Sequence, residues 1–257
     1  MLFFEAGLVV HIPHSKTVIP LEYKELFLLP DDALHAELLR MTDLYTDELF
    51  DISDAQVIFP ISRLVCDVER FREEQQEIMT RKGMWVCYTK TSDNKPLKEV
   101  NAKHKEEILE KYYDAHHRKL TDIVDLTLQA QGSCLLIDAH SFPSEPLPYE
   151  ISQSRERPDI CIGTDSYHTP WQLIEAAKGY FKERGYVVAL NSPFNGCLVP
   201  QKHYHKNPNL FALMLEINRK LYMDEKTGAK KEAFLRIKSD IASFFKAPLP
   251  AQTTEHV

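Results

Sequence analysis

The chain has 257 residues, of which 44% are hydrophobic and 27% are charged, and its formal net charge is -7. These proportions are typical of one soluble globular domain over residues 1–257, with enough interior for a large sheet covered by helices. The negative charge argues against a protein that binds the phosphate backbone of nucleic acids. No stretch approaches the roughly 18 consecutive apolar residues that span a bilayer, so we expect no membrane-spanning segment.

The five cysteines are scattered and never occur as Cys-x-x-Cys. This pattern indicates neither a disulfide framework nor a zinc ribbon. The apolar N-terminus lacks a basic leading region and is interrupted by Glu5, so it is expected to form a strand rather than a secretory signal. These features favour a cytoplasmic protein and leave its oligomeric state open.

Apolar runs and helical repeats alternate in the first half of the chain. After the first strand, apolar residues from Leu34 to Leu49 recur at helical spacing and predict one helix. Extended segments are expected at 57–59 and 62–69, and a short strand at 85–88. A long helical pattern fills residues 96–131, with a break near 101–105 and Gly132 as its C-terminal cap.

The second half repeats this alternation. Four runs have the length of strands, at residues 133–137, 158–165, 186–190 and 212–217. Helices are expected after Thr169-Pro170 and over residues 229–245. Residues 144–157 are rich in Pro, Ser and charge, which predicts a lid or substrate loop. The alternation predicts an α/β fold with a mainly parallel or mixed central sheet between helical layers.

Four apolar runs end in polar side chains that can perform chemistry. These side chains are, in chain order, His11, His14, Asp67, Glu69, Arg70, Asp138, His140, Glu216 and Arg219. Residues two apart in a strand share a face, so Asp138 and His140 are expected to project together. Because ligands bind at the carboxyl ends of strands in open α/β sheets, we expect the four strand ends to form one site.

Two imidazoles and one carboxylate form a ligand set suited to zinc, with a position left for water. His14 and His140 are the expected nitrogen ligands, and Asp67 or Glu69 is the expected carboxylate ligand. Glu216, at another strand end, is the expected general base.

Arginines add positive charge to this acidic chain. Arg63, Arg70 and Arg219 suit substrate carboxylates, which a guanidinium grips bidentately. Arg63 and Arg70 lie on opposite faces of an ideal strand, so they converge only if the backbone turns at Glu69, as we predict. The alternative is that the segment is a solvated edge strand that carries an ion pair.

The remaining histidines have a plainer interpretation. His116 and His117 lie on a largely apolar helical face and are expected to be structural. His203 and His205 lie in a charged loop, where such a pair is more often polar surface than a metal site.

Short motifs occur in a fixed order along nearly the whole chain. They are His-Ile-Pro-His-Ser at 11–15, Ser62-Arg63, Asp67-x-Glu69-Arg70, Tyr113 with His116, Asp138-x-His140-Ser141, Pro158-Asp159 with Gly163-Thr164, Asn191-x-Pro193-Phe194-Asn195-Gly196, and Glu216 with Tyr222. As an ordered set they resemble the N-formylglutamate amidohydrolase (N-formylglutamate deformylase) family. That family is similar to the zinc carboxypeptidase and aspartoacylase group.

The resemblance implies a zinc carboxypeptidase-like (phosphorylase/hydrolase-like) α/β fold and attack of metal-activated water on a linear amide. It implies that His14 and His140 bind Zn2+, with Asp67 placed ahead of Glu69 as the third ligand. It also implies that Arg63 stabilises the oxyanion and that Glu216 is the general base. The expected substrate-binding residues are Glu69, Arg70, Asn191, Asn195 and Arg219.

Two positions depart from the patterns that the resemblance implies. The wider group has His-x-x-Glu for its first two ligands, whereas the residue three after His14 is Thr17. Glu69 stands where the family commonly has asparagine.

Three functions follow from these observations. The leading hypothesis is a zinc-dependent hydrolase that cleaves the amide of a small N-acyl amino acid such as N-formylglutamate. A zinc carboxypeptidase-like peptidase is the second, and it differs in the room required around residues 144–157. The third is a non-catalytic relative that binds an acidic metabolite. Glu216 and both histidines are intact, which favours an enzyme.

Overall fold

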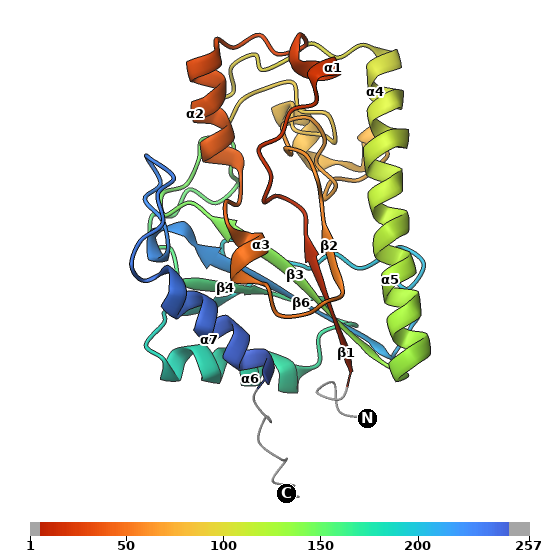
Figure 1. Cartoon of the computed structure of the whole chain (residues 1–257), viewed down its shortest axis with the longest axis vertical. Coiled ribbons are helices and arrows are strands. Elements are labelled where there is room, and N and C mark those ends of the chain that lie inside the picture. The colour runs from red at the N-terminus through yellow and green to blue at the C-terminus, as the bar shows by residue number, and fades with distance from the viewer. Residues whose placement is uncertain (1–5, 247–257) are drawn as a thin grey trace, which may run out of the picture.

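The structure is a computed structural model of the chain and describes residues 6–246 (Figure 1). Within these residues, six strands form one sheet in the order β2-β1-β3-β6-β4-β5. The strands are β1 (Gly7–Ile12), β2 (Gln56–Ile58), β3 (Cys134–Phe142), β4 (Ile160–Gly163), β5 (Val188–Leu190) and β6 (Leu210–Asn218). Neighbours run parallel, except that β4 is antiparallel to β6. The prediction of an α/β fold with a mainly parallel or mixed sheet is confirmed.

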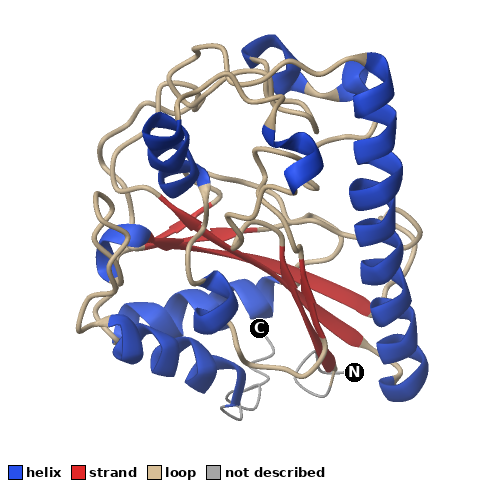
Figure 2. Ribbon diagram, turned by 45° about the horizontal axis from the view of Figure 1, so that its top comes forward, coloured by secondary structure: helices blue, strands red, loops and turns tan. Residues whose placement is uncertain are grey.

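Helices cover both faces of the sheet (Figures 1 and 2). They are α1 (Leu21–Lys24), α2 (Asp31–Met41), α3 (Thr46–Leu49), α4 (Ala102–Ile108), α5 (Ala115–Gln131), α6 (Trp171–Glu183) and α7 (Phe234–Lys246). Shorter turns are η2 (Glu74–Gln76), η3 (Ile78–Lys82), the π-helical η4 (Leu109–Asp114) and η5 (Arg219–Leu221). None of these described helices has the length and apolar character needed to cross a bilayer.

Side-chain alternation along β3 separates the two faces of the sheet. Ile137 packs into the core formed with α6 and α7, whereas Leu136 packs into the core formed with α5. Asp138 and His140 are in step with Leu136, so they project on the α5 face near the carboxyl end of the strand. The same alternation places four chemically active side chains on that face: His11, Asp138, His140 and Glu216. The strand predicted at 133–137 therefore continues through Asp138 and His140.

The helix predicted from Leu34 to Leu49 is interrupted. Helix α2 ends at Met41 and α3 begins at Thr46, with Tyr45 in the left-handed region at φ 69°. Asp43 lies in this break, and its backbone N–H donates to the carbonyl of His14 at 2.9 Å. The prediction of one helix was wrong, and the break brings Asp43 to the carboxyl edge of the sheet.

The segments predicted to be extended at 62–69 and 85–88 consist of turns, so both strand predictions were wrong. The buried Lys98 supports the first segment, since its Nζ donates to the carbonyls of Leu64 at 2.5 Å and Val65 at 2.8 Å. The long helical run begins at Ala102 with Asn101 as its N-cap, rather than breaking there. It ends as predicted at Gly132, which adopts φ 74°.

Candidate functional site

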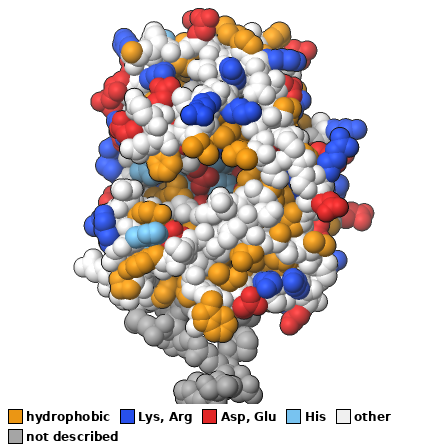
Figure 3. Space-filling view, turned by 180° about the vertical axis from the view of Figure 1, so that it is seen from behind, with side chains coloured by type: hydrophobic (Ala, Val, Ile, Leu, Met, Phe, Trp, Pro, Cys, Tyr) orange, Lys and Arg blue, Asp and Glu red, His pale blue; other side chains and the backbone are white. Residues whose placement is uncertain are grey.

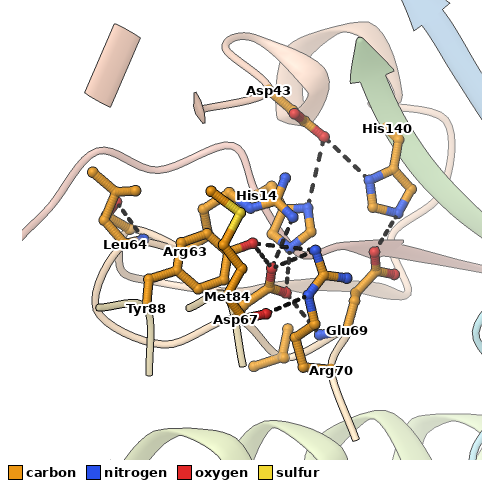
Figure 4. Close-up of polar contacts among 12 residues, drawn as sticks. His14, Asp43, Arg63, Leu64, Asp67, Glu69, Arg70, Met84, Tyr88 and His140 are labelled. Carbon is orange, nitrogen blue, oxygen red and sulfur yellow. Dashed lines mark hydrogen bonds and ion pairs between the residues drawn. The ribbon is translucent and has the colours of Figure 1, made fainter. Parts of the chain in front are cut away.

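His14, Asp43 and His140 converge beside the carboxyl ends of β1 and β3 (Figure 4). Asp43 Oδ2 lies 3.1 Å from His140 Nδ1 and 3.8 Å from His14 Nδ1. All three residues are at most 4% exposed, and His14 Nδ1 has no hydrogen-bond partner among the described residues. Two imidazoles and a carboxylate in this arrangement are the donor set of a divalent transition cation such as zinc.

Further residues orient this group. His14 Nε2 lies 2.9 Å from Asp67 Oδ1, and Asp43 Oδ1 accepts a hydrogen bond from Arg219 Nη2 at 2.7 Å. If His14 Nε2 donates to Asp67, the lone pair of His14 Nδ1 faces Asp43. Burial acts to raise the pKa of Asp43, but His14, His140 and Arg219 together hold it well below its usual range. Asp43 is therefore an anion in the folded protein.

Asp67, the expected third ligand, is occupied by protein groups. Its Oδ1 faces His14, and its Oδ2 accepts from Arg63 Nη2 at 2.8 Å and from the Tyr88 hydroxyl at 2.5 Å. Although burial opposes ionisation, Arg63 holds the pKa of Asp67 well below its usual range. The geometry favours Asp43 as the third ligand. The contact of Asp67 with His14 Nε2 fits a residue that orients the His14 ring. Sequence reasoning did not include Asp43.

Arg63 and Arg70 converge, as predicted, and they do so on Asp67 (Figure 4). Arg70 Nε donates to the carbonyl of Met84 at 3.2 Å, and its Nη2 donates to the Tyr88 hydroxyl at 3.2 Å. Arg63 Nε, in contrast, is buried without a hydrogen-bond partner in the described part of the chain. Arg63 therefore has a donor to offer to a substrate oxygen, whereas two donors of Arg70 are engaged.

Glu216 stands beside His140 because the two residues are register partners on β6 and β3. It is 7% exposed, and its Oε2 is buried with no hydrogen-bond partner within residues 6–246. Burial raises the pKa of Glu216 to about 8. A carboxyl group with a pKa near neutrality is suited to taking up and releasing a proton.

A second polar group lies on the other side of His140. His140 Nε2 lies 3.0 Å from Glu69 Oε2 and 3.3 Å from Asp138 Oδ1. His11 Nδ1 lies 2.8 Å from the same Asp138 oxygen, and His11 Nε2 lies 2.8 Å from His116 Nε2. Burial lowers the pKa of His116 to about 2, so that ring is neutral at physiological pH. His116, predicted to be structural, thus contacts the site through His11.

The family model for N-formylglutamate amidohydrolase matches residues 6–223. The chain belongs to the N-formylglutamate amidohydrolase family. Among solved structures, N-formylglutamate amidohydrolase from Ralstonia eutropha is similar, with a TM-score of 0.81 and 22% identity over 93% of this chain and 91% of that chain. A gene product of Agrobacterium tumefaciens has a TM-score of 0.65 and 19% identity over 94% of this chain and 89% of that chain. These two similarities show a shared fold. Among curated proteins, none matches the chain.

In this member of the N-formylglutamate amidohydrolase family, the predicted asparagines lie on exposed parts of the loop after β5. Asn191 Oδ1 accepts from the Thr164 N–H at 2.9 Å, and its Nδ2 donates to Thr164 Oγ1 at 2.8 Å. Asn195 is exposed on the same loop. The loop meets the site further on, where the Leu198 N–H donates to Asp138 Oδ2 at 2.8 Å. The contacts of Asn191 indicate that it holds the loop.

The predicted lid loop at 144–157 packs through Leu147 and Tyr149 against the apolar cluster that contains Leu64, Met84 and Tyr88. Glu150 and Arg157 form a buried ion pair, and Arg157 Nη1 donates to the carbonyl of Pro143 at 3.1 Å. Burial raises the pKa of Tyr149, and the positive charge of Arg63 acts against this rise. The loop is therefore anchored near Arg63.

A hollow on the face opposite that of Figure 1 displays histidine and acidic side chains, the residue types of the site (Figure 3).

Proposed function

We propose that this protein is a zinc-dependent amidohydrolase that cleaves the amide bond of an N-acyl amino acid such as N-formylglutamate. The observation that carries the proposal is the position of Glu216 beside His140, with its buried Oε2 free of hydrogen bonds to the described residues. Membership of the N-formylglutamate amidohydrolase family and the similarity to the Ralstonia eutropha protein support the choice of substrate. The anchored loop at 144–157 favours a small substrate over a peptide.

The site residues fit a divalent cation. His14 Nδ1 is a buried nitrogen without a hydrogen-bond partner in the described part of the chain. Asp43 is anionic, and His140 Nδ1 faces the Asp43 oxygen that is nearest to His14 Nδ1. These three side chains would hold the cation, with Asp67 orienting His14 and Arg219 orienting Asp43. When bound, zinc polarises an amide carbonyl and lowers the pKa of water.

The chain itself supplies the proton transfers. Glu216 takes a proton from the water that attacks the carbonyl carbon of the amide. The oxygen of the tetrahedral intermediate becomes negative, and Arg63, whose Nε has no protein partner in the described chain, donates to it. As the C–N bond breaks, Glu216 gives the proton to the leaving nitrogen. The products are a carboxylic acid, formate for an N-formyl substrate, and a free amino acid.

Substrate recognition is assigned to the positive charge beside this centre. Arg70 contributes charge toward the substrate carboxylate, and its contacts with Met84 and Tyr88 fix its direction. Asp67 offsets the charge of one of the two arginines, Arg63 and Arg70, so a positive charge remains for the substrate carboxylate.

A substrate panel tests the proposal. Zinc-loaded protein is incubated with N-formylglutamate, N-acetylglutamate, N-formylalanine amide and a dipeptide, and the released amine is measured. We expect turnover of N-formylglutamate and slower turnover of N-formylalanine amide, which lacks both carboxylates. Release of a C-terminal residue from the dipeptide alone would favour the peptidase alternative. Absence of turnover with the whole panel would contradict the proposed substrate class.

A further inference from the structure

We propose that the protein binds a second divalent cation in a site formed by His11, Glu69 and Asp138, with the remaining ring nitrogen of His140. Mixed imidazole and carboxylate ligands suit a borderline transition ion such as Zn2+. This second site goes beyond the proposed function, which requires the His14, Asp43 and His140 centre alone.

The ligand atoms of the second site are close together. The ligand atoms of His11, Glu69 and Asp138 lie within 4.8 Å of one another. Asp138 Oδ1 and Glu69 Oε1 lie 2.8 Å and 3.9 Å from His11 Nδ1. The side chains of His11 and Asp138 are almost fully buried, whereas that of Glu69 is 17% exposed. The group therefore has suitable ligand types and spacing, with one ligand reaching solvent.

A separate observation at His140 points into the same group. His140 is 4% exposed, and its buried Nε2 makes no hydrogen bond to the residues that the structure describes. This nitrogen nevertheless lies 3.0 Å from Glu69 Oε2 and 3.3 Å from Asp138 Oδ1. The opposite nitrogen of the ring, Nδ1, faces Asp43 in the first site. One imidazole ring can bind a cation through each nitrogen once its proton is released, and metal binding releases such protons.

The two carboxylates of the second site give it a negative charge that suits a cation. Across residues 6–246, the ion-pair partners of Glu69 and Asp138 are His11 and His140, and no lysine or arginine pairs with either carboxylate. Two neighbouring carboxylates in a largely buried position are costly without compensating charge. A divalent cation matches the formal charge of this pair.

The arginines of the site do not supply that charge. Arg63 and Arg70 pair with Asp67, and Arg219 pairs with Asp43. Their positive charge is therefore placed around the first site.

His116 supports the ligand role of His11. The two Nε2 atoms lie 2.8 Å apart, so one of them donates a hydrogen bond to the other. In the structure His11 Nδ1 donates to Asp138 Oδ1 at 2.8 Å. When His11 Nε2 donates to His116, release of the Nδ1 proton on metal binding would leave the Nδ1 lone pair directed at a cation between His11 and Asp138. His116 then orients His11 in the same way that Asp67 orients His14.

Zinc counting on the full chain tests the second site. Metal-free protein is saturated with Zn2+, unbound metal is removed, and zinc per chain is measured by mass spectrometry. We expect two zinc ions in the wild type and one in His11→Gln, in Glu69→Gln and in His14→Ala. Glu69→Gln is the safer variant for folding because its side chain is partly exposed. Circular dichroism and melting temperature report whether each variant is folded.

A surface histidine provides the matched control. His205 is exposed and lies 3.0 Å from Asp165 Oδ2, so it forms a histidine–carboxylate pair outside both sites. His205→Ala should keep both zinc ions. The second site would be overturned if the wild type binds two zinc ions, His205→Ala binds one, and His11→Gln still binds two.

The remaining outcomes separate this inference from the proposed function. One zinc ion in the wild type that is lost in His14→Ala and kept in His11→Gln overturns the second site and leaves the first standing. One zinc ion that is lost in His11→Gln and kept in His14→Ala supports the second site and overturns the first. Two zinc ions in both folded His11→Gln and folded Glu69→Gln overturn the second site.

Discussion

His140 and Glu216 are register partners on the parallel strands β3 and β6, and both project on the face covered by α5. The apolar pairs that precede them, Leu136 with Ala212 and Ile137 with Leu213, fix this register by filling opposite cores. A slip of one residue would turn one strand's polar side chains into the α6 and α7 core. The packing of the sheet therefore places the candidate base beside the candidate ligand.

Replacing Glu216 by glutamine should lower kcat by about 10²-fold or more, because the amide cannot accept the proton of the attacking water. Zinc content and substrate affinity should stay close to those of the wild type. Steady-state kinetics with zinc analysis check this, and Glu183→Gln, an exposed residue at the end of α6, is the matched control. Unchanged kcat in folded Glu216→Gln would assign the proton transfer to another residue.

The two carboxylates near His14 should differ in their effect on zinc. Asp43→Asn should abolish binding at the first site, because it removes the anionic ligand itself. Asp67→Asn should weaken binding by roughly 10–100-fold, the usual effect of losing a group that orients a ligand. Competition with a chelator of known affinity measures both variants. Loss of zinc in Asp67→Asn with only weakened zinc binding in Asp43→Asn would make Asp67 the third ligand.

Substitutions of the two arginines should change different kinetic parameters. Arg63→Ala should mainly lower kcat, by roughly 10²–10³-fold, because the Arg63 Nε, which has no hydrogen-bond partner among residues 6–246, would donate to the oxyanion. Arg70→Lys should mainly raise KM, since a lysine cannot reproduce the fork that contacts Met84 and Tyr88. Both parameters are measured with N-formylglutamate and with N-formylalanine amide. An equal KM effect on the two substrates in Arg70→Lys would argue against a carboxylate contact.

Lys98 should make stability depend on pH. Burial lowers the pKa of Lys98 from 10.5 to about 8, so between these values the unfolded chain binds more protons than the folded chain. The contribution of Lys98 to the free energy of unfolding should therefore rise with pH across this window, by up to about 3 kcal/mol. Urea unfolding of the wild type and of Lys98→Met at pH 7.5 and pH 10 measures this. A stability difference between the two proteins that stays constant or falls with pH would contradict the assignment.

The site residues that lie on or directly after strands were predictable, because short stretches of sequence indicate them. His14, His140 and Glu216 follow or end apolar runs, and the alternation of strand residues predicts which side chains share a face. The structure brings all three to the same edge of the sheet. Their assigned roles as ligands and base remain proposals.

Asp43 could not be identified in the same way. It lies between Met41 and Leu44, within apolar spacing that fits one continuous helix. The chain leaves α2 at Thr42, which is extended, and Tyr45 then adopts a left-handed conformation before α3 begins. Neither threonine nor tyrosine is a residue type that signals such a break. The available hint was an aspartate two residues after Met41, the last buried residue of α2.

The segment that carries Arg63, Asp67 and Arg70 was misjudged as a strand because its charges alternate. Its turns are held by distant groups, including the buried Lys98, which contacts the carbonyls of Leu64 and Val65. Such long-range support leaves no local pattern in the sequence. The pairing of His11 with Asp138 likewise depends on the register of β1 and β3, which the sequence of either strand does not specify.

The most direct test of the central claim is the hydrolysis of N-formylglutamate before and after removal of metal. Formate and glutamate are measured with purified wild-type protein, with metal-free protein, and with metal-free protein to which Zn2+ is returned. The account predicts turnover in the first, its loss in the second, and its recovery in the third, with no recovery in His14→Ala. Undiminished turnover by verified metal-free protein, or no turnover by folded zinc-loaded protein, would contradict it.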